Sequence, residues 1–158
     1  MRVTILTISD SVAAGKAEDL SGAALKERCR ELGWWIVSAT VCADDRPAIE
    51  AFLRENADSN DTDVILTTGG TGLGPRDVTP EATQAVVDRL IPGLPEQMRA
   101  AGAEKTPRAL LSRAAAGLRG KTMIINLPGS PRGAVESLDA IADLLAHAVS
   151  VIHGARHD

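Results

Sequence analysis

The sequence predicts an α/β protein, a three-layer α/β/α sandwich with a mainly parallel central sheet. Apolar runs of strand length alternate with helix-like segments from one end of the chain to the other. Within each run consecutive residues are apolar, which is typical of parallel strands that are covered on both faces. The chain has 158 residues, the length of one domain, and we expect residues 1–158 to form a single domain.

The predicted strands are short, apolar and rich in β-branched residues. They cover residues 3–9, 34–41, 64–68 and 122–127. The predicted helices lie between and after these strands. They cover residues 22–32, a segment that begins near Pro47, residues 80–90, one or two stretches within 94–116, and a long final helix from about 132 to 152.

Proline, capping residues and apolar spacing identify three of these helices. Pro47 suits the first turn of a helix because its φ is fixed and it lacks an N–H. Thr79, Pro80 and Glu81 supply an N-cap, a first-turn proline and a first-turn acid. The final helix has an apolar face at helical spacing, which we expect to pack in the core. The residues of this face are Val135, Leu138, Ile141, Leu145, Ala148, Val149 and Ile152.

Composition excludes several classes of protein. Apolar residues make up 44% and charged residues 24%, as in folded domains and unlike disordered chains. No apolar run approaches the roughly 20 residues that span a bilayer, and we expect no signal peptide and a cytoplasmic location. The net charge of -4 disfavours a nucleic-acid binder. The aromatic residues are only Trp34, Trp35 and Phe52, so a bound nucleotide would be held by backbone groups and small side chains.

The cysteines and histidines show no pattern that is typical of a metal or redox site. Cys29 and Cys42 have neither Cys-x-x-Cys nor Cys–His spacing, and we expect both to be buried, reduced thiols. His147, His153 and His157 fall on or beyond the final helix, where we expect a solvated helix end instead of a catalytic group.

Four loops that follow predicted strands are rich in glycine, serine, proline and aspartate. They are residues 9–11, 44–45, 69–74 and 128–132. Ligands bind at the carboxyl ends of parallel strands, where loops of this kind meet. We therefore expect the functional site at this edge of the sheet.

The loop at residues 67–77 has four glycines in six positions, at 69, 70, 72 and 74. Glycine lets backbone N–H groups approach a phosphate without interference from a Cβ atom. A Walker loop is excluded because no Lys-Ser/Thr pair follows. The dinucleotide fingerprint is excluded because the spacing is Gly-x-Gly-x-Gly and runs into Pro75. A tight strand-to-helix connection without a ligand stays open as the alternative.

Charged residues are unevenly placed around these loops. Asp44 and Asp77 each follow a strand, with Asp45 and Asp10 at the same rim, and such carboxylates suit Mg²⁺ beside phosphate oxygens. Helix capping or solvation is the alternative, which we favour for Asp45. The segment 99–132 holds seven basic residues and one acid, which leaves 10 basic and 20 acidic residues elsewhere. This imbalance indicates either a local anion pocket or a solvated helix face.

Four motifs together resemble the MogA/MoaB family of molybdenum-cofactor biosynthesis over nearly the whole chain. They read TTGGTG, PRDVTPEAT, SRAAAGLRG and INLPGSP. The intact RDVTPE segment, which is typically altered in the MoaB-like branch, resembles the molybdopterin adenylyltransferase branch, also found as the G domains of plant and animal fusion proteins. Gly72 favours the same branch, since the molybdenum-inserting relatives carry serine there. Ala43 departs from the family, which usually has proline before the first acid.

The resemblance implies Mg²⁺-dependent transfer of AMP from ATP to the terminal phosphate of molybdopterin, with release of pyrophosphate. The family's two essential acids fall on Asp44 and Asp77, which we expect to be catalytic and to hold Mg²⁺. The other residues expected to bind nucleotide or molybdopterin are Ser9, Asp10, Ser11, Thr68, Gly69, Gly70, Thr71, Gly72, Glu81, Ser112, Arg113, Asn126, Pro128, Gly129, Ser130 and Arg132. Of these, residues 69–72 are expected on the nucleotide, residues 9–11 at the pocket floor, and Ser112, Arg113, Ser130 and Arg132 around the pterin or its phosphate.

No side-chain nucleophile or general base is required for this reaction, because the attacking phosphate is already anionic. The resemblance further implies a homotrimer and handover of the product to a molybdenum-inserting protein, and we expect no nucleic-acid or membrane partner. Two alternatives stay open. One is a MoaB-like protein that binds molybdopterin or a nucleotide without significant turnover, and the other, ranked last, is a scaffolding role.

Overall fold

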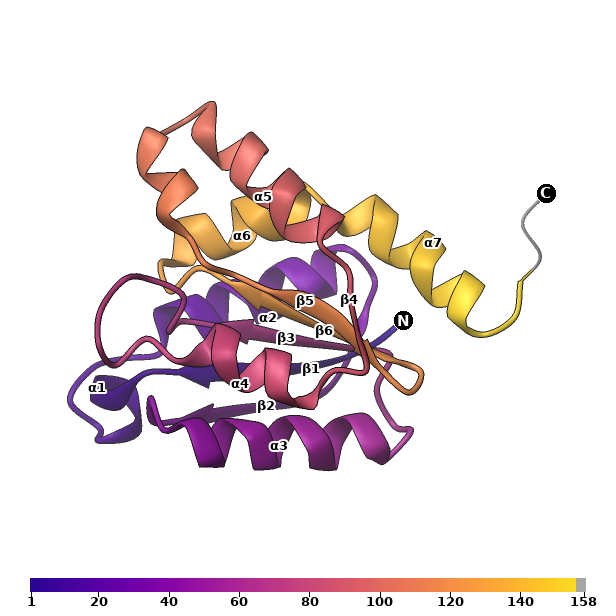
Figure 1. Ribbon diagram of the computed structural model, residues 1–158, viewed down its shortest axis with the longest axis horizontal. Coiled ribbons are helices and arrows are strands. Elements are labelled where there is room, and N and C mark those ends of the chain that lie inside the picture. The colour runs from indigo at the N-terminus through magenta and orange to yellow at the C-terminus, as the bar shows by residue number, and fades with distance from the viewer. Residues whose placement is uncertain (156–158) are drawn as a thin grey trace.

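The computed structural model describes residues 1–155 and contains a six-stranded sheet between two layers of helices (Figure 1). The strands follow the order β2-β1-β3-β6-β5-β4 across the sheet. They are β1 (Arg2–Ile8), β2 (Trp35–Cys42), β3 (Val64–Thr68), β4 (Arg89–Leu90), β5 (Ala116–Arg119) and β6 (Thr122–Leu127). β1 pairs in parallel with β2 and β3, and β3 pairs in parallel with β6, whereas β5 is antiparallel to both of its neighbours. The predicted α/β class with a mainly parallel sheet is confirmed.

The helices cover both faces of this sheet. They are α1 (Asp10–Ala13), α2 (Leu20–Glu31), α3 (Arg46–Asp58), α4 (Thr79–Val86), α5 (Gly93–Ala103), the 3₁₀ helix η1 (Pro107–Leu111), α6 (Pro131–Asp139) and α7 (Ala142–Ile152). Apolar residues of α2, α5, α6 and α7 pack on one face, and those of α3 and α4 pack on the other. The three layers predicted from the sequence are therefore present.

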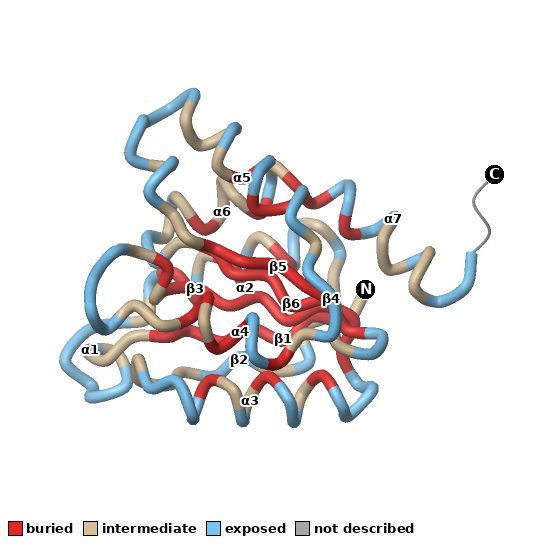
Figure 2. The backbone as a smooth tube through the Cα atoms, in the orientation of Figure 1, coloured by how far each residue is buried: buried red, intermediate tan, exposed pale blue. Residues whose placement is uncertain are grey.

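Alternation along each strand separates two hydrophobic cores. In β1, Val3 and Ile5 face the core beneath α2 and α6, whereas Leu6 and Ile8 face the core beneath α3. Every residue of β3 and of β6 is buried, which explains why these strands read as continuous apolar runs. Figure 2 shows this buried sheet between helices that are exposed on their outer sides.

Three predicted helix boundaries are wrong. The predicted helix 132–152 is two helices, because the helix is interrupted at Ala140 and Ile141. The apolar residues Leu138, Ile141 and Leu145 are nearly completely buried at this interruption and on both sides of it. The predicted helix 80–90 ends at Val86, and residues 89–90 instead pair with β5 as a strand. The last residue of the predicted helical stretch 94–116 belongs to β5. The antiparallel strands β4 and β5 have two and four residues, too few for a periodic signal.

The two thiols differ in burial. Cys29 is fully buried as expected, but Cys42 is only half-buried, and both are free. The pKa of both thiols is raised to about 11, by burial at Cys29 and by burial together with the nearby charges of Asp44 and Asp45 at Cys42. Both sulfurs therefore stay protonated near neutral pH, which makes them poor nucleophiles.

His147 and His153 lie away from the strand ends that carry the predicted site. The Nε2 of His153 lies 3.2 Å from Oδ1 of Asp63, at the opposite edge of the sheet. His147 is exposed on α7, and His157 falls outside the residues that the structure describes. None of the helices within residues 1–155 is long and apolar enough to cross a membrane.

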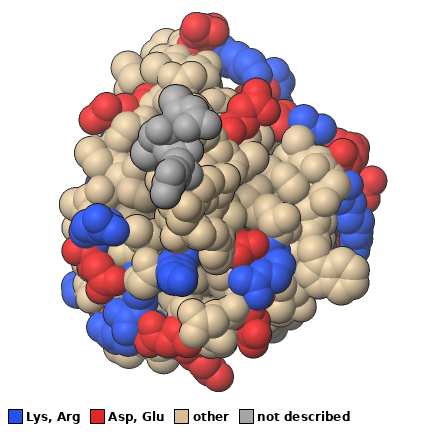
Figure 3. Space-filling model, turned by 90° about the vertical axis from the view of Figure 1, so that its right-hand side faces the viewer, with Lys and Arg blue, Asp and Glu red and all other residues tan. Residues whose placement is uncertain are grey.

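Ion pairs neutralise much of the basic segment 99–132. Arg119 pairs with Asp58, Arg113 with Glu81, and both Arg132 and Lys105 with Glu136. Figure 3 views the side of the molecule that carries α7 and shows basic and acidic side chains interspersed. The segment therefore does not form one continuous cationic surface. Three basic residues of the segment have no ion pair within residues 1–155: Arg99, Arg108 and Lys121.

Candidate functional site

The predicted loops meet at the carboxyl edge of the sheet because β2, β1, β3 and β6 are parallel neighbours. The N–H of Ser9 donates to the carbonyl of Cys42 at 2.9 Å, and the N–H of Gly69 donates to the carbonyl of Leu127 at 3.2 Å. Gly129 is so close to Gly69 that a Cβ atom there would lie 3.3 Å from the Gly69 Cα. The predicted convergence of these loops is confirmed.

Two cavities lie on either side of the glycine loop. The first, which we call the aspartate cavity, has a volume of about 400 Å³ and is lined by residues of the loops after β1, β2 and β3, including Asp44 and Asp77. The second, which we call the α5 cavity, has a volume of about 450 Å³ and lies among the glycine loop, α5, η1 and the start of α6. Two adjoining spaces of this size suit two ligands that meet at the loop.

The base of the glycine loop has a backbone conformation that requires glycine. Gly69 and Gly70 have φ values of 101° and 69°, in the left-handed region. A Cβ atom on Gly69 would lie 2.2 Å from the Ile8 carbonyl oxygen, and one on Gly70 would lie 2.2 Å from Oγ1 of Thr79. Both conformation and space therefore exclude other residues at these two positions.

Thr79 holds the base of this loop instead of capping α4 from outside. Its hydroxyl donates to the carbonyl of Gly69 at 2.9 Å, and its N–H donates to the carbonyl of Gly70 at 3.1 Å. Val78 occupies the cap position, without a side-chain hydrogen bond, and Thr79 is the first residue of the helix. The prediction of Thr79 as the N-cap is therefore wrong, because its hydroxyl satisfies the loop.

Asp77 lies at the far end of the loop, folded back over it. One carboxylate oxygen, Oδ2, accepts the N–H of Gly74 at 2.8 Å. A Cβ atom on Gly72 would lie 2.9 Å from the same oxygen, so glycine leaves room for the carboxylate. The other oxygen, Oδ1, has no hydrogen-bond partner within residues 1–155 and is available to a ligand.

Asp44 is held in a reciprocal pair with Asp10. Oδ2 of Asp44 accepts the N–H of Asp10 at 3.0 Å, and Oδ1 of Asp10 accepts the N–H of Asp44 at 3.0 Å. Oδ1 of Asp44 accepts no hydrogen bond from the described part of the chain and faces Gly70. Partial burial raises the pKa of Asp44, and the negative charges of Asp10 and Asp77 raise it further.

This donor set suits a divalent cation that is shared with a ligand. The negative charge of Asp77 is close enough to raise the pKa of Asp44, a repulsion that a bound cation relieves. Within residues 1–155 no group of three or more His, Cys, Asp or Glu side chains could hold a metal ion. Mg²⁺ needs no such cage, because it takes one or two carboxylates and completes its shell with phosphate oxygens and water.

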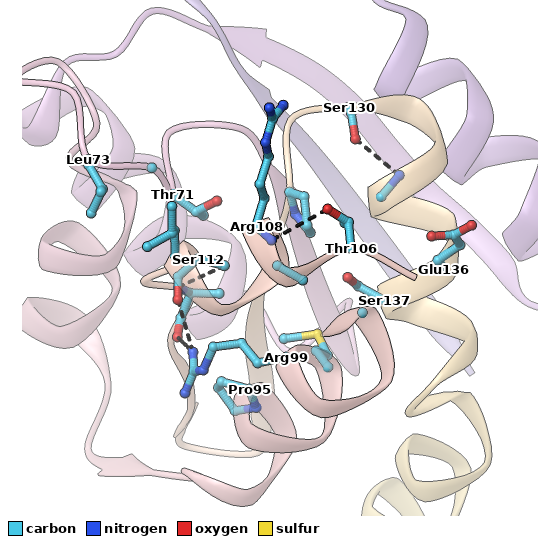
Figure 4. A pocket seen from close by; sticks show the side chains of 18 residues that line it. Thr71, Leu73, Pro95, Arg99, Thr106, Arg108, Ser112, Ser130, Glu136 and Ser137 are labelled. Carbon is cyan, nitrogen blue, oxygen red and sulfur yellow. Dashed lines mark hydrogen bonds between the residues drawn. The ribbon is translucent and has the colours of Figure 1, made fainter. Parts of the chain in front are cut away.

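The α5 cavity differs in chemistry from the aspartate cavity. Its wall contains apolar side chains, such as those of Met98, Leu111 and Ala114. It also contains polar side chains, such as those of Thr106, Arg108 and Ser137, which are labelled in Figure 4. Arg99 donates to the carbonyls of Ser112 and Ala114, at 3.3 and 3.4 Å. This mixed wall suits a flat, partly apolar group that carries polar substituents.

The structure divides the predicted site residues into three sets. The aspartate cavity is lined by Ser9, Ser11, Asp44, Thr68, Gly69, Gly70, Asp77 and Gly129. The α5 cavity is lined by Thr71, Gly72, Ser112, Pro128 and Ser130. The remaining predicted residues line neither cavity. They are Asp10, Glu81, Arg113, Asn126 and Arg132.

Three residues of the last set have other partners. Asn126 is fully buried and donates to the hydroxyls of Thr67 and Thr83, at 3.0 and 2.8 Å, so it joins strands to α4. Arg132 is exposed and pairs with Glu136 on its own helix at 2.7 Å. Asp10 pairs with Arg76 through both carboxylate oxygens, at 2.9 and 3.0 Å. Their assignment to ligand contacts stays a prediction.

Arg113 and Glu81 are the other two, and they pair with each other. The guanidinium of Arg113 also donates to the carbonyls of Gly72 and Asp77, both at 2.8 Å. It therefore faces the inside of the glycine loop, and its predicted contact with the pterin or its phosphate stays a prediction.

Sequence reasoning missed Asp19 and the residues that α5 and η1 contribute. Asp19 lines the aspartate cavity and accepts hydrogen bonds from the Thr7 hydroxyl and the Gly22 N–H, both at 2.9 Å. An aspartate three residues before Gly22 is an N-cap signal, but the helix was expected to begin at Gly22. Arg99 and Arg108 belong to the basic segment, for which the sequence left open an anion pocket or a solvated helix face. The structure places both residues in the wall of the α5 cavity.

Comparison with known proteins identifies relatives over nearly the whole chain. A family model for a probable molybdopterin binding domain matches residues 4–147. A molybdopterin adenylyltransferase of Helicobacter pylori is 40% identical over 156 residues, which are 98% of this chain and 89% of that protein. A molybdopterin adenylyltransferase of Escherichia coli K12 is 37% identical over 163 residues, 98% of this chain and 79% of that protein.

Solved structures share both fold and sequence with the chain. The molybdopterin biosynthesis enzyme MoaB from Thermus thermophilus superposes with a TM-score of 0.92 at 47% identity, covering 99% of each chain. The molybdopterin biosynthesis Mog protein from Mycobacterium ulcerans has a TM-score of 0.86 at 40% identity, covering 95% of this chain and 97% of the other. With the glycine loop and strand-end acids in place, the chain belongs to the molybdopterin-binding family of molybdenum-cofactor biosynthesis.

Proposed function

We propose that the protein is a molybdopterin adenylyltransferase that transfers AMP from ATP to the terminal phosphate of molybdopterin and releases pyrophosphate. One observation carries the proposal most strongly. Asp44 and Asp77 each have one carboxylate oxygen fixed by a backbone N–H and the other open, at the loop that separates the two cavities. Such an arrangement suits metal-assisted transfer between two phosphates.

The two cavities suit the two substrates in different ways. The aspartate cavity takes the phosphates of ATP, because its glycine loop exposes backbone N–H groups and its acids can share Mg²⁺ with phosphate oxygens. The α5 cavity takes the pterin, because its wall is more apolar. The two reacting phosphates would then meet beside Gly70 and Gly72.

The chain contributes positioning and electrostatics to the reaction. Asp44 and Asp77 would hold Mg²⁺, which supplies positive charge beside the transferred phosphoryl group. The loop N–H groups orient the nucleotide, and the closed base of the loop at Thr79 keeps them in place. The accepting phosphate is anionic at neutral pH, so the described residues need not remove a proton from it.

The names of the relatives support this activity, and the resemblance to the family extends the proposal. A homotrimer, a cytoplasmic location and handover to a molybdenum-inserting protein are part of it. A relative from Chlorobaculum tepidum, 36% identical, is named a molybdenum cofactor biosynthesis bifunctional protein, and the chain spans 50% of its length. Light scattering of the purified protein tests the trimer, which a monomer or dimer mass would contradict.

Binding of molybdopterin without turnover is the second candidate. One observation favours it: Ala43 replaces the proline that usually precedes the first acid in the family. Incubation of the protein with molybdopterin, Mg²⁺ and labelled ATP separates the two candidates. Stoichiometric or repeated release of pyrophosphate is expected for the adenylyltransferase, and tight molybdopterin binding without pyrophosphate would support the binding protein.

A further inference from the structure

Arg113 joins the two ends of the exposed part of the glycine loop. Its Nε donates to the carbonyl of Gly72 and its Nη2 to the carbonyl of Asp77, both at 2.8 Å. Its own N–H donates to the carbonyl of Thr71 at 2.9 Å. One residue therefore holds the loop on both sides of its exposed tip, residues 73–76.

Glu81 anchors the same guanidinium from the first turn of α4. Its Oε1 pairs with Nη1 of Arg113, and the pairing lowers the pKa of the carboxyl group. Its Oε2 is buried and has no hydrogen-bond partner in the described part of the chain. The carboxylate is thus committed to Arg113, and the planar guanidinium is fixed from three directions.

The neighbours of Arg113 in sequence form part of the other cavity. Ser112 and Ala114 line the α5 cavity, and Arg99 ties their carbonyls to α5. A shift of this wall therefore moves Arg113, and a shift of Arg113 moves the main chain of Asp77. The two cavities share one hydrogen-bonded connection.

We propose that Arg113 is a positioning residue that keeps the Asp77 carboxylate in register with the wall of the α5 cavity. The inference rests on the proposed function, since it concerns the relative placement of the two substrates. Transfer between two bound phosphates requires both to lie within near-attack distance, and a misplacement of about 1 Å can cost roughly 100-fold in rate. Arg113 acts through Asp77 and lines neither cavity.

The variants Arg113→Met and Arg113→Lys test this role, with Arg119→Met as the matched control. Arg119 also makes three side-chain contacts to a carboxylate and the main chain, two to Asp58 at 2.9 Å and one to the carbonyl of Val86 at 2.8 Å, at the other end of α4. Loss of either arginine removes comparable hydrogen bonds, so both methionine variants should melt at lower temperature. Only Arg113 should affect the site.

Steady-state adenylylation separates positioning from stability. Both Arg113 variants should lower kcat by roughly 30- to 100-fold, with KM for molybdopterin within about threefold of wild type. Lysine should restore much of the melting temperature but little of kcat, because one ammonium group cannot span three acceptors. Recovery of kcat in parallel with stability, or an equal loss in Arg119→Met, would overturn the inference.

Hydrogen exchange of the ligand-free protein gives a readout that does not depend on activity. The amides of residues 72–74 and 76–78 should exchange faster in Arg113→Met than in Arg119→Met, because the loop opens locally. Equal exchange in the two variants would overturn the inference even if the enzyme is active. If the wild type is inactive but the loop exchanges faster in Arg113→Met, the result counts against the proposed function. The role of Arg113 in holding the loop is then still supported.

Discussion

The two cavities of this site are built in different ways. The aspartate cavity lies on the ends of parallel strands, and short hydrogen bonds from Thr79, Gly74 and Asp10 fix its loop and its acids. The α5 cavity lies between the glycine loop and the helices α5, η1 and α6, and its arginine contacts are longer, at 3.3 and 3.4 Å for Arg99. The loop and acids of the first cavity are therefore held by shorter hydrogen bonds than Arg99 of the second.

This difference matches a division between chemistry and recognition. Charge stabilisation requires groups that are already in place, because reorganisation during the reaction is costly. Recognition of a larger ligand tolerates adjustable side chains such as Arg108, which has no ion pair within residues 1–155. Changes in the aspartate cavity should therefore affect rate, and changes in the α5 cavity should affect affinity for molybdopterin.

The largest effect is expected for Asp77→Asn. Asparagine keeps the size of the side chain but removes the charge that would hold Mg²⁺ beside the phosphates. The loss should be about 3–4 kcal/mol, or roughly 10²–10³ in kcat. Single-turnover adenylylation at saturating ATP and Mg²⁺ measures it.

A structural role for Asp77 predicts a different result for the same variant. Its Oδ2 accepts the N–H of Gly74, a bond that asparagine can also accept, so the turn should survive. Stability would then change little, and a merely structural carboxylate would leave the rate near that of wild type. Retention of more than a third of the wild-type rate would reject the catalytic assignment.

Gly72→Val should weaken ATP binding by about tenfold, an effect of roughly 1.4 kcal/mol, because Gly72, although it lines the α5 cavity, lies against the carboxylate of Asp77 in the aspartate cavity. A Cβ atom at this position would lie 2.9 Å from Oδ2 of Asp77, so the carboxylate must move. Calorimetric titration with ATP and Mg²⁺ measures the affinity, and an unchanged far-ultraviolet spectrum serves as the control for folding. Unaltered affinity in a folded variant would mean that the loop is only a connection.

Arg108→Ala should raise KM for molybdopterin about fivefold, or roughly 1 kcal/mol, without changing the affinity for ATP. Arg108 lines the α5 cavity and is free to contact an anionic substituent of the ligand. Lys121→Ala is the matched control, because Lys121 also lacks an ion pair among the described residues but lies at the opposite edge of the sheet. An effect on ATP affinity instead of molybdopterin would reverse the division between the cavities.

The smallest effect on the site is expected from Asp63, which lies outside both cavities. Burial tends to raise its pKa, but hydrogen bonds from the Arg2 side chain and N–H outweigh burial and lower it. A lowered pKa stabilises the folded state above about pH 4, and this contribution is lost as pH falls through the folded pKa. Thermal melts of Asp63→Asn should show a lower melting temperature at pH 7 than the wild type and a smaller decrease in melting temperature on acidification. Calorimetric titration should show unchanged ATP affinity.

The parallel part of the fold could be predicted from the sequence because its signals are local. Buried strands such as β3 and β6 are continuous apolar runs, and the order of strands and helices follows from their alternation. The break at Ile141 could not be predicted, because the apolar spacing continues through it and tertiary packing decides the turn. The two-residue strand β4 depends on pairing with β5, which no local pattern indicates.

The site shows the same limit. Asp44, Asp77 and the glycines could be found because each follows a strand, and the topology places strand ends together. The role of Arg113 could not, since its three acceptors are two backbone carbonyls and Glu81, which are distant in sequence. The charge of a side chain is known from the sequence, but only the fold determines whether that side chain contacts a ligand or other residues of the chain.

A crystal structure of the protein with Mg²⁺ and a non-hydrolysable ATP analogue tests the central claim most directly. The account predicts that the phosphates bind in the aspartate cavity. Mg²⁺ should be bound by Asp44 and Asp77, and phosphate oxygens should lie near the backbone N–H of Gly70. It also predicts an α5 cavity that stays open for the second substrate. Phosphates bound between Arg99 and Arg108 in the α5 cavity, with no metal at the two aspartates, would contradict it.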